Sequence, residues 1–391
     1  MKILIANKFY YPRGGDCIYT INLEELLSKH GHDVAVFAMQ HPANMYSHWS
    51  KYFPSEVKFS SGSGIIEAIR RPFGTSEVKK KFNDLLNDFQ PDVVHLNNIH
   101  GQISPIIAKI AHENGVRTVW TLHDYKLLCP RYDCLRNGTE ICELCFTDKK
   151  NVVKNCCMKN SLFVSLLAYL ETQKWTKEEL ERCTDAFICP SQFITNKMIQ
   201  GGFNKNKIVS LYHFINIGKT KNENYNKEDY FCYLGRLSHE KGIKTMIEAA
   251  RQLPYQLKIV GSGPLLEELR KSTKNKNIEF LGFKNWGEVK EIVGKARFSV
   301  VPSEWYEVFG LVIVEALCLG TPVLGSDIGA IPELITIEKN GILFESRNVE
   351  NLKEQITKMF NTNFDYAHIA SESQNRYSAE HYYNELMNVY R

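Results

Sequence analysis

The sequence predicts an α/β protein built from two doubly wound domains. Short runs rich in β-branched residues alternate with amphipathic helical patterns along the 391-residue chain. The alternation stops at an Asn/Lys-rich stretch, residues 216–229, and then restarts. Such alternation is typical of parallel sheets, and a chain of this length exceeds one ordinary core.

The N-terminal half carries the first series of strands and helices. "KILIAN" and "DVAVFA" are predicted strands, and "CIYTINLEELLSKH" is the helix between them. The strand pattern recurs in "PDVVHLN" (91–97), "RTVWTLHD" (117–124) and "DAFICPS" (185–191). We therefore predict a first domain over residues 1–215 with a cysteine-rich insertion at 129–157, followed by a linker over 216–229.

The C-terminal half repeats the pattern. Its predicted strands are "YFCYLGRLS" (230–238), "QLKIVGSGP" (256–264), "IEFLGF" (278–283), "RFSVVPS" (297–303), "TPVLGSD" (321–327) and "GILF" (341–344). A buried helix from about Val308 to Leu319 precedes the strand near Gly325. These elements predict a second domain over residues 230–375. We also expect a helix over residues 376–391, which could pack back on the first domain.

Composition limits the function. Hydrophobic residues make up 43% of the chain and charged residues 24%, which is typical of a soluble globular protein. The net charge of +4 and the absence of an aromatic-basic motif argue against nucleic-acid binding. Eleven cysteines, an odd number, and no recognisable export signal predict a cytoplasmic protein with mostly free thiols. Glu315 interrupts the one stretch of near membrane-spanning length.

Three glycine-containing turns follow predicted strands. "FYYPRGGD" places Gly14 and Gly15 before the first helix, where a ligand could approach the backbone, although on this feature alone an ordinary strand-to-helix turn is the simpler explanation. "YLGRLSHEKG" places Arg236 and Lys241 where two cations could bind a diphosphate, or where they could simply be solvated. "VGSGPLLEEL" adds Gly261 and Gly263 in a similar setting (260–269).

The segment "PSEWYEVFGLVIVEALCLGTPV" carries the strongest signal. If both were helical, Glu307 and Glu315 would lie about 12 Å apart, near the length of a sugar–diphosphate–ribose string. N–H groups at Phe309, Gly310 and Leu311 would face phosphate between them. Glu315 would accept hydrogen bonds from ribose, and Glu307 would meet the sugar. The alternative for Glu315 is an internal ion pair.

Taken together, "YLGRLSHEKG", "GSGPLLEEL", "GF", "VVPSEWYEVFGLVIVEALCLGTPVLGSDIGAIPEL" and "NGILF" resemble family 4 of the retaining glycosyltransferases (glycosyl transferases group 1). "YYPRGGD", "PDVVHLNN" and "TLHDYKLLCP" extend the resemblance into the first half. It implies the GT-B fold, in which two Rossmann-like domains face each other across a cleft. The first domain would bind the acceptor and the second the nucleotide sugar.

The resemblance also assigns roles. Arg236 and Lys241 would bind the donor diphosphate, and Glu307 and His123 would line the sugar site. The substrate-binding set would comprise Gly14, Gly15, Gly261, Gly263, Phe283, Phe309, Gly310, Leu311 and Glu315. Without the resemblance, His123 would be interpreted as a core histidine.

The implied activity is metal-independent, retaining transfer of a hexosyl group (EC 2.4) from a UDP- or GDP-sugar to a glycan or lipid-linked acceptor. Bacterial surface polysaccharide, capsule or lipopolysaccharide, is the expected product, and no cofactor is required. The enzyme would be cytoplasmic, either free or peripheral at the inner face of the membrane. Front-face attack and a covalent intermediate both remain open. So do two other functions, a nucleotide-sugar 2-epimerase and a catalytically silent binding module.

The cysteine-rich insertion has two interpretations. Cys142 and Cys145 have metal-ligand spacing, and with Cys129 and Cys157 they could form a structural zinc site; free thiols are the alternative. The adjoining apolar helix, "SLFVSLLAYLETQKW" (161–175), is expected to be core, with contact to a membrane-linked acceptor as the other interpretation.

Overall fold

The computed structural model describes residues 1–57, 62–216, 218 and 225–391, and it divides the chain into two compact units. The first comprises Met1–Cys134, Cys142–Tyr212 and Tyr382–Arg391, and the second Leu135–Ile141 and His213–His381. Half of the predicted linker, 216–229, lies outside the described residues. Its last two positions belong to a strand that begins at Glu228.

A parallel six-stranded sheet forms the centre of the first unit, in the order β2-β1-β3-β4-β7-β8. Its strands are β1 (Lys2–Ala6), β2 (Asp33–Phe37), β3 (Val93–Leu96), β4 (Arg117–Thr121), β7 (Ala186–Cys189) and β8 (Ile208–Ser210). All residues of β3 and β7 are buried. Continuous apolar runs, rather than alternating ones, are what burial on both faces requires.

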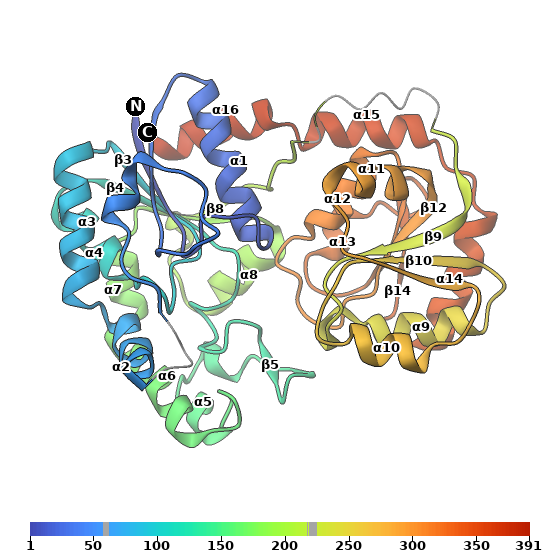
Figure 1. Ribbon diagram of the computed structural model, residues 1–391, viewed down its shortest axis with the longest axis horizontal. Helices are drawn as coiled ribbons and strands as arrows, with labels where there is room; N and C mark the ends of the chain where they lie inside the picture. Colours follow the sequence, from blue (N-terminus) through green and yellow to red (C-terminus); the bar gives the residue numbers. More distant parts are fainter. Residues whose placement is uncertain (58–61, 217, 219–224) are drawn as a thin grey trace. The chain divides into compact units, whose positions relative to one another are not determined.

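Helices cover this sheet on both sides. Figure 1 shows α3 (Ser76–Phe89) and α4 (Ile106–Glu113) along one side and α1 (Gly15–Lys29) along the other. The remaining helices of the unit's main segments are α2 (Gly62–Arg70), α5 (Asn151–Lys154), α6 (Leu162–Lys174), α7 (Lys177–Arg182) and α8 (Gln192–Gln200), with short 3-10 turns η1 (His48–Tyr52), η2 (Arg71–Phe73), η3 (Leu144–Phe146) and η4 (Lys205–Lys207). A two-stranded hairpin, β5 (Leu135–Arg136) and β6 (Glu140–Ile141), interrupts the cysteine-rich segment.

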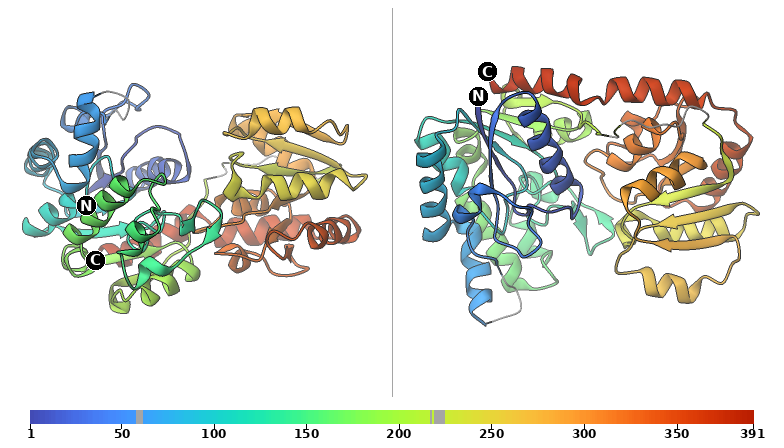
Figure 2. Two further views of the ribbon diagram at one scale, coloured as in Figure 1. Left: turned by 90° about the horizontal axis from the view of Figure 1, so that it is seen from below. Right: turned by 45° about the horizontal axis from the view of Figure 1, so that its top comes forward.

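The last helix, α16 (Ala379–Tyr390), brings the chain end into the first unit. His95 Nδ1 lies 2.5 Å from the Tyr390 hydroxyl, and the Arg117 guanidinium donates to the carbonyl of Val389 at 2.9 and 3.0 Å. The Tyr19 and Tyr382 hydroxyls also hydrogen-bond. These contacts explain why both termini lie close together in Figures 1 and 2.

The second unit repeats the architecture with a parallel sheet in the order β11-β10-β9-β12-β13-β14. Its strands are β9 (Glu228–Leu234), β10 (Gln256–Val260), β11 (Ile278–Gly282), β12 (Ala296–Val301), β13 (Val323–Ser326) and β14 (Gly341–Phe344); its helices are η5 (His239–Lys241), α9 (Ile243–Arg251), α10 (Leu266–Ser272), α11 (Trp286–Lys295), α12 (Leu311–Cys318), α13 (Ile331–Leu334), α14 (Val349–Asn361) and α15 (Tyr366–Arg376). Figure 1 shows α9 and α10 on one side of the sheet and α11 and α12 on the other. The predicted α/β class is confirmed.

Candidate functional site

The phosphate-binding residues predicted from sequence follow β9 and β12, two neighbouring strands of the second sheet. Carboxyl ends of parallel strands meet at one edge of a doubly wound sheet, where ligands bind. Lys241 ends η5 after β9, and Glu307 lies between β12 and α12. Lys241 Nζ lies 2.7 Å from Glu307 Oε1. The fold thus brings together two residues that are 66 positions apart.

Glu307 is held as a carboxylate. Its side chain is nearly buried, and burial alone would raise its pKa. The Lys241 ammonium and the hydrogen bond from Ser303 together oppose that effect, so the pKa of Glu307 lies below its ordinary value. The Ser303 hydroxyl donates to Oε1 at 2.5 Å. A buried carboxylate fixed in this way is rigid and charged, as a sugar-binding or catalytic carboxylate must be.

Lys241 itself is positioned by more than its carboxylate partner. Its ammonium lies 4.9 Å from the centroid of the Trp305 ring, and its side chain is 26% exposed. Arg236 is exposed, and within the described ranges its guanidinium takes part in no ion pair. The site therefore offers one cation fixed beside Glu307 and one free to bind an anion.

Helix α12 begins later than predicted. It starts at Leu311 rather than Val308, because Gly310 adopts φ +110°, a conformation that α-helical residues do not have. Phe309 is buried against His213 and Tyr377 instead of opening the helix. The N–H groups of Ile313 and Val314 donate to the Gly310 carbonyl, so the groups without an intrahelical acceptor are those of Leu311 and Val312. Leu311 is the first residue of the helix, whereas Phe309 and Gly310 precede it.

Glu315 lies in α12 among apolar residues, partly exposed. Burial raises the pKa of Glu315 to about 7. Among the described residues it forms no ion pair, so the internal ion pair considered from the sequence is not found. A carboxylate kept in an unfavourable environment without a cation is typical of a functional site rather than a stabilising one.

Gly261 and Gly263 serve loop packing. A Cβ atom at Gly261 would lie 1.9 Å from the Gly235 carbonyl oxygen, and one at Gly263 would lie 2.4 Å from that of Leu237. The Leu237 N–H donates to the carbonyl of Ser262 at 3.0 Å. The two glycines allow the loop after β10 to contact the loop that carries Arg236.

Phe283 follows β11 and is 82% exposed.

The first unit places His123 at the carboxyl edge of its own sheet, directly after β4. His123 Nε2 lies 2.9 Å from Asn97 Oδ1, and its ring contacts Tyr19 edge-on at 5.0 Å. Burial, followed by the charges of His95 and Lys8, lowers the pKa of His123 to about 3. The imidazole is therefore neutral at physiological pH and can position a hydroxyl group by hydrogen bonding.

Gly14 and Gly15 stand at the start of α1, as the resemblance implies, but Gly14 has an extended backbone that any residue adopts. Sequence reasoning missed Lys8 and Asp124, which lie at the same edge of the sheet. The Lys8 charge acts on both His123 and Asp124. Burial raises the pKa of Asp124, and the neighbouring lysines partly oppose that effect. Their position directly after a strand was the signal available in the sequence.

The cysteine-rich segment differs from the predicted zinc quartet. Interactions with Cys145 and with Cys134, which was not predicted, lower the pKa of the Cys129 thiol, so these three residues lie near one another. Cys157 instead contacts the carbonyl of Asn151 at 4.0 Å. In the part of the chain that the structure describes, no three Cys, His, Asp or Glu side chains have the arrangement of a metal site. The four predicted thiols are therefore not arranged around a metal position, and the zinc site stays a prediction.

Comparison with known proteins places the chain in a family. The model "Glycosyltransferase Family 4" matches residues 13–219, and "Glycosyl transferases group 1" matches residues 215–378. An uncharacterized 42.6 kDa protein in the cps region of Klebsiella pneumoniae is 28% identical over 87% of this chain and 89% of that protein. An uncharacterized glycosyltransferase of Methanocaldococcus jannaschii is 26% identical over 100% of this chain and 98% of its own.

Solved structures show the same fold at low identity. The lipopolysaccharide outer core galactosyltransferase WaaB is 14% identical, with a TM-score of 0.67 over 100% of this chain and 99% of its own. Anabaena HepE in complex with UDP-glucose is 18% identical, with a TM-score of 0.67 and the same coverage. The fold is GT-B, as predicted. The chain belongs to glycosyltransferase family 4.

Proposed function

We propose that this glycosyltransferase transfers a sugar with retention and without a metal, from a UDP- or GDP-sugar to a glycan or lipid-linked acceptor in surface polysaccharide synthesis. The observation that carries the proposal is the Lys241–Glu307 pair next to the exposed Arg236 guanidinium and the start of α12. Cations and helix N–H groups can stabilise a departing diphosphate, the electrostatic role that a divalent ion often fills.

Each unit has its own task in this proposal. Arg236, Lys241 and the α12 start bind the diphosphate, Glu315 accepts from the ribose, and Glu307 orients the sugar. In the first unit, neutral His123 lines the sugar site by hydrogen bonding. The UDP-glucose complex of HepE supports a nucleotide-sugar donor, and the cps region of the Klebsiella relative supports a surface-polysaccharide role. The proposed enzyme works in the cytoplasm, peripherally at the inner membrane face.

A Glu307→Gln variant tests the assignment. It keeps the shape of the side chain and removes the charge, so transfer should fall by about 10²-fold or more while nucleotide-diphosphate affinity changes little. Transfer is followed with lipid-linked acceptors and a panel of UDP- and GDP-sugars, with EDTA present. Undiminished transfer would contradict the role of Glu307, and an absolute requirement for added metal would contradict metal independence. Epimerised free nucleotide sugar formed without acceptor would favour an epimerase.

A structural zinc at Cys129, Cys142, Cys145 and Cys157 is a separate part of the proposal, and it rests on the metal-ligand spacing of Cys142 and Cys145 in the sequence. Because the described thiols are not already arranged around a metal position, binding would require them to move together. Elemental analysis of protein purified without added zinc decides the matter. Stoichiometric zinc that is lost on Cys142→Ser supports the site, and zinc-free, fully folded protein refutes it.

A further inference from the structure

Helix α6 exposes an apolar face, although the sequence favoured a core helix over its other interpretation, contact with a membrane-linked acceptor. Leu162, Phe163, Leu166 and Leu170 are 62, 60, 43 and 44% exposed. Their spacing places them on one side of the helix. The opposite side buries Ser165, Ala168 and Glu171. The expectation that this helix is core is therefore wrong for half of its surface.

Helix α2 adds two further exposed apolar side chains beside this face. Ile65 and Ile66 are 49 and 59% exposed. The two helices meet at η2, which directly follows α2: Trp175 Nε1 donates to the Pro72 carbonyl at 2.8 Å at the end of α6. Figure 1 shows α2 and α6 next to each other at the same end of the first unit. We call the six side chains on these helices (Ile65, Ile66, Leu162, Phe163, Leu166 and Leu170) the α2–α6 apolar surface.

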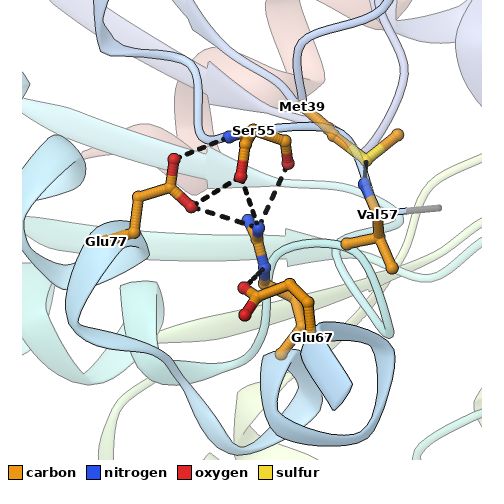
Figure 3. Close-up of polar contacts among 6 residues, drawn as sticks. Met39, Ser55, Val57, Glu67 and Glu77 are labelled. Carbon is orange, nitrogen blue, oxygen red and sulfur yellow. Dashed lines mark hydrogen bonds and ion pairs between the residues drawn. The ribbon is translucent and has the colours of Figure 1, made fainter. Parts of the chain in front are cut away.

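The orientation of α2 is fixed by a buried cation. Arg71 is fully buried, and its guanidinium binds Glu67 Oε1 at 2.8 Å, Glu77 Oε2 at 3.2 Å and the Ser55 carbonyl at 3.1 Å. Figure 3 shows Glu67, Glu77 and Ser55 converging on this contact. Because Glu67 points toward Arg71, Ile65 and Ile66 are not free to turn into the core.

Cations are in excess around the surface. Arg70, Lys150, Lys159 and Lys174 are exposed on or next to α2, α5 and α6. The carboxylates of this region are already neutralised within the protein: Glu67 binds Arg71, Glu171 binds Lys126 at 2.9 Å, and Asp148 lies 3.4 Å from Lys154. Exposed leucine, isoleucine and phenylalanine surrounded by cations are the features by which amphipathic helices bind anionic lipid.

From these observations we propose that the α2–α6 apolar surface docks on an anionic lipid membrane. The exposed side chains enter the boundary between head groups and acyl chains, and the surrounding cations contact lipid phosphates. A second copy of the chain is a poor occupant, because a symmetric contact would set the same cations against each other. The proposed function locates the enzyme at the inner membrane face, and the present proposal names the surface that would bind there. It rests on that proposed location for its biological role. The surface itself involves no residue of the donor site.

The full-length protein is tested by co-sedimentation with vesicles of phosphatidylcholine alone and of phosphatidylcholine mixed with phosphatidylglycerol. We expect binding to the anionic vesicles, weakened by salt. The affinity of the Phe163→Ser/Leu166→Ser variant for anionic vesicles should fall by roughly tenfold or more, because each side chain contributes apolar area. Lys159→Gln and Arg70→Gln should each lower the affinity for anionic vesicles about fivefold. Ile199→Ser, which removes a side chain 45% exposed on α8, is the matched control and should change nothing.

Circular dichroism and melting curves establish that the variants are folded, which their exposed positions favour. Equal partition of the Phe163→Ser/Leu166→Ser and Ile199→Ser proteins would overturn the proposal. So would a concentration-dependent dimer that this double substitution dissociates. Nucleotide binding, followed separately by thermal shift, is expected to be unaffected in every variant. Vesicle binding and nucleotide binding are therefore tested independently. Failure of the donor-site assignment does not decide the membrane proposal, and failure of the membrane proposal does not decide the donor-site assignment.

Discussion

Replacing Glu315 by glutamine should stabilise the protein at alkaline pH while weakening nucleotide binding. Burial raises the pKa of Glu315 to about 7, against an ordinary value of 4.5. A carboxyl whose pKa is raised on folding binds a proton more tightly in the folded state. Its contribution to stability is therefore complete below pH 4.5 and is lost as pH rises through 7.

The expected magnitude follows from this shift. This pKa difference of about 2.5 units destabilises the folded state by about 3 kcal/mol at pH 8 and by about 1 kcal/mol at pH 5. Partial solvent contact of the side chain reduces the first figure to about 2 kcal/mol. Glutamine carries no charge to bury, so Glu315→Gln should recover this energy. In a unit of this size the melting temperature should rise by about 4–8 °C at pH 8, and by much less at pH 5.

Differential scanning calorimetry at the two pH values measures the effect. Glu279→Gln, at an exposed position of β11 in the same unit, is the control and should leave both melting temperatures unchanged. An equal shift at pH 5 and pH 8, or a lower melting temperature at pH 8, would refute the burial argument. Isothermal titration with UDP and GDP completes the test, because a ribose-binding carboxylate should cost affinity when it is neutralised.

Three further substitutions test other features of the fold. Lys241→Met removes the cation from buried Glu307 and should destabilise the protein by about 2–3 kcal/mol while weakening diphosphate binding, measured by urea denaturation and titration. Gly261→Ala places a Cβ atom against the Gly235 carbonyl at a residue with φ +136°, and should cost about 2–4 kcal/mol by the same denaturation assay. Arg71→Met leaves two carboxylates without their buried cation and should cost about 3–5 kcal/mol, read from the melting transition of the first unit.

Matched controls separate these mechanisms from general sensitivity. Lys244→Met breaks an exposed pair with Glu268 and should change stability by less than about 1 kcal/mol. Gly115→Ala, with φ +71° and no atom within 4 Å of a new Cβ, should cost about 1–2 kcal/mol. Lys80→Met, at an exposed pair with Asp84, should be nearly neutral. Controls as damaging as the three test variants would contradict the packing and charge arguments.

Much of the candidate site could be found from sequence because its residues are close in sequence and follow strands. Glu307, Leu311 and Glu315 lie within one strand–loop–helix unit, and Arg236 and Lys241 lie within another. The start of α12 was placed too early because a glycine conformation, φ +110° at Gly310, decides it. Cys134 was missed because ligand spacing in sequence does not report which thiols a loop brings together.

The sequence by itself determined the α/β class, because strands buried on both faces must be apolar runs separated by helices. It also determined the family, whose motifs are contiguous segments. Only the tertiary structure decided which charges are neutralised and which apolar residues stay exposed. Arg71 is buried between two carboxylates, and one face of α6 is left in solvent. Both depend on partners supplied by distant segments, and an apolar helix gives no indication in its own sequence of which face will find them.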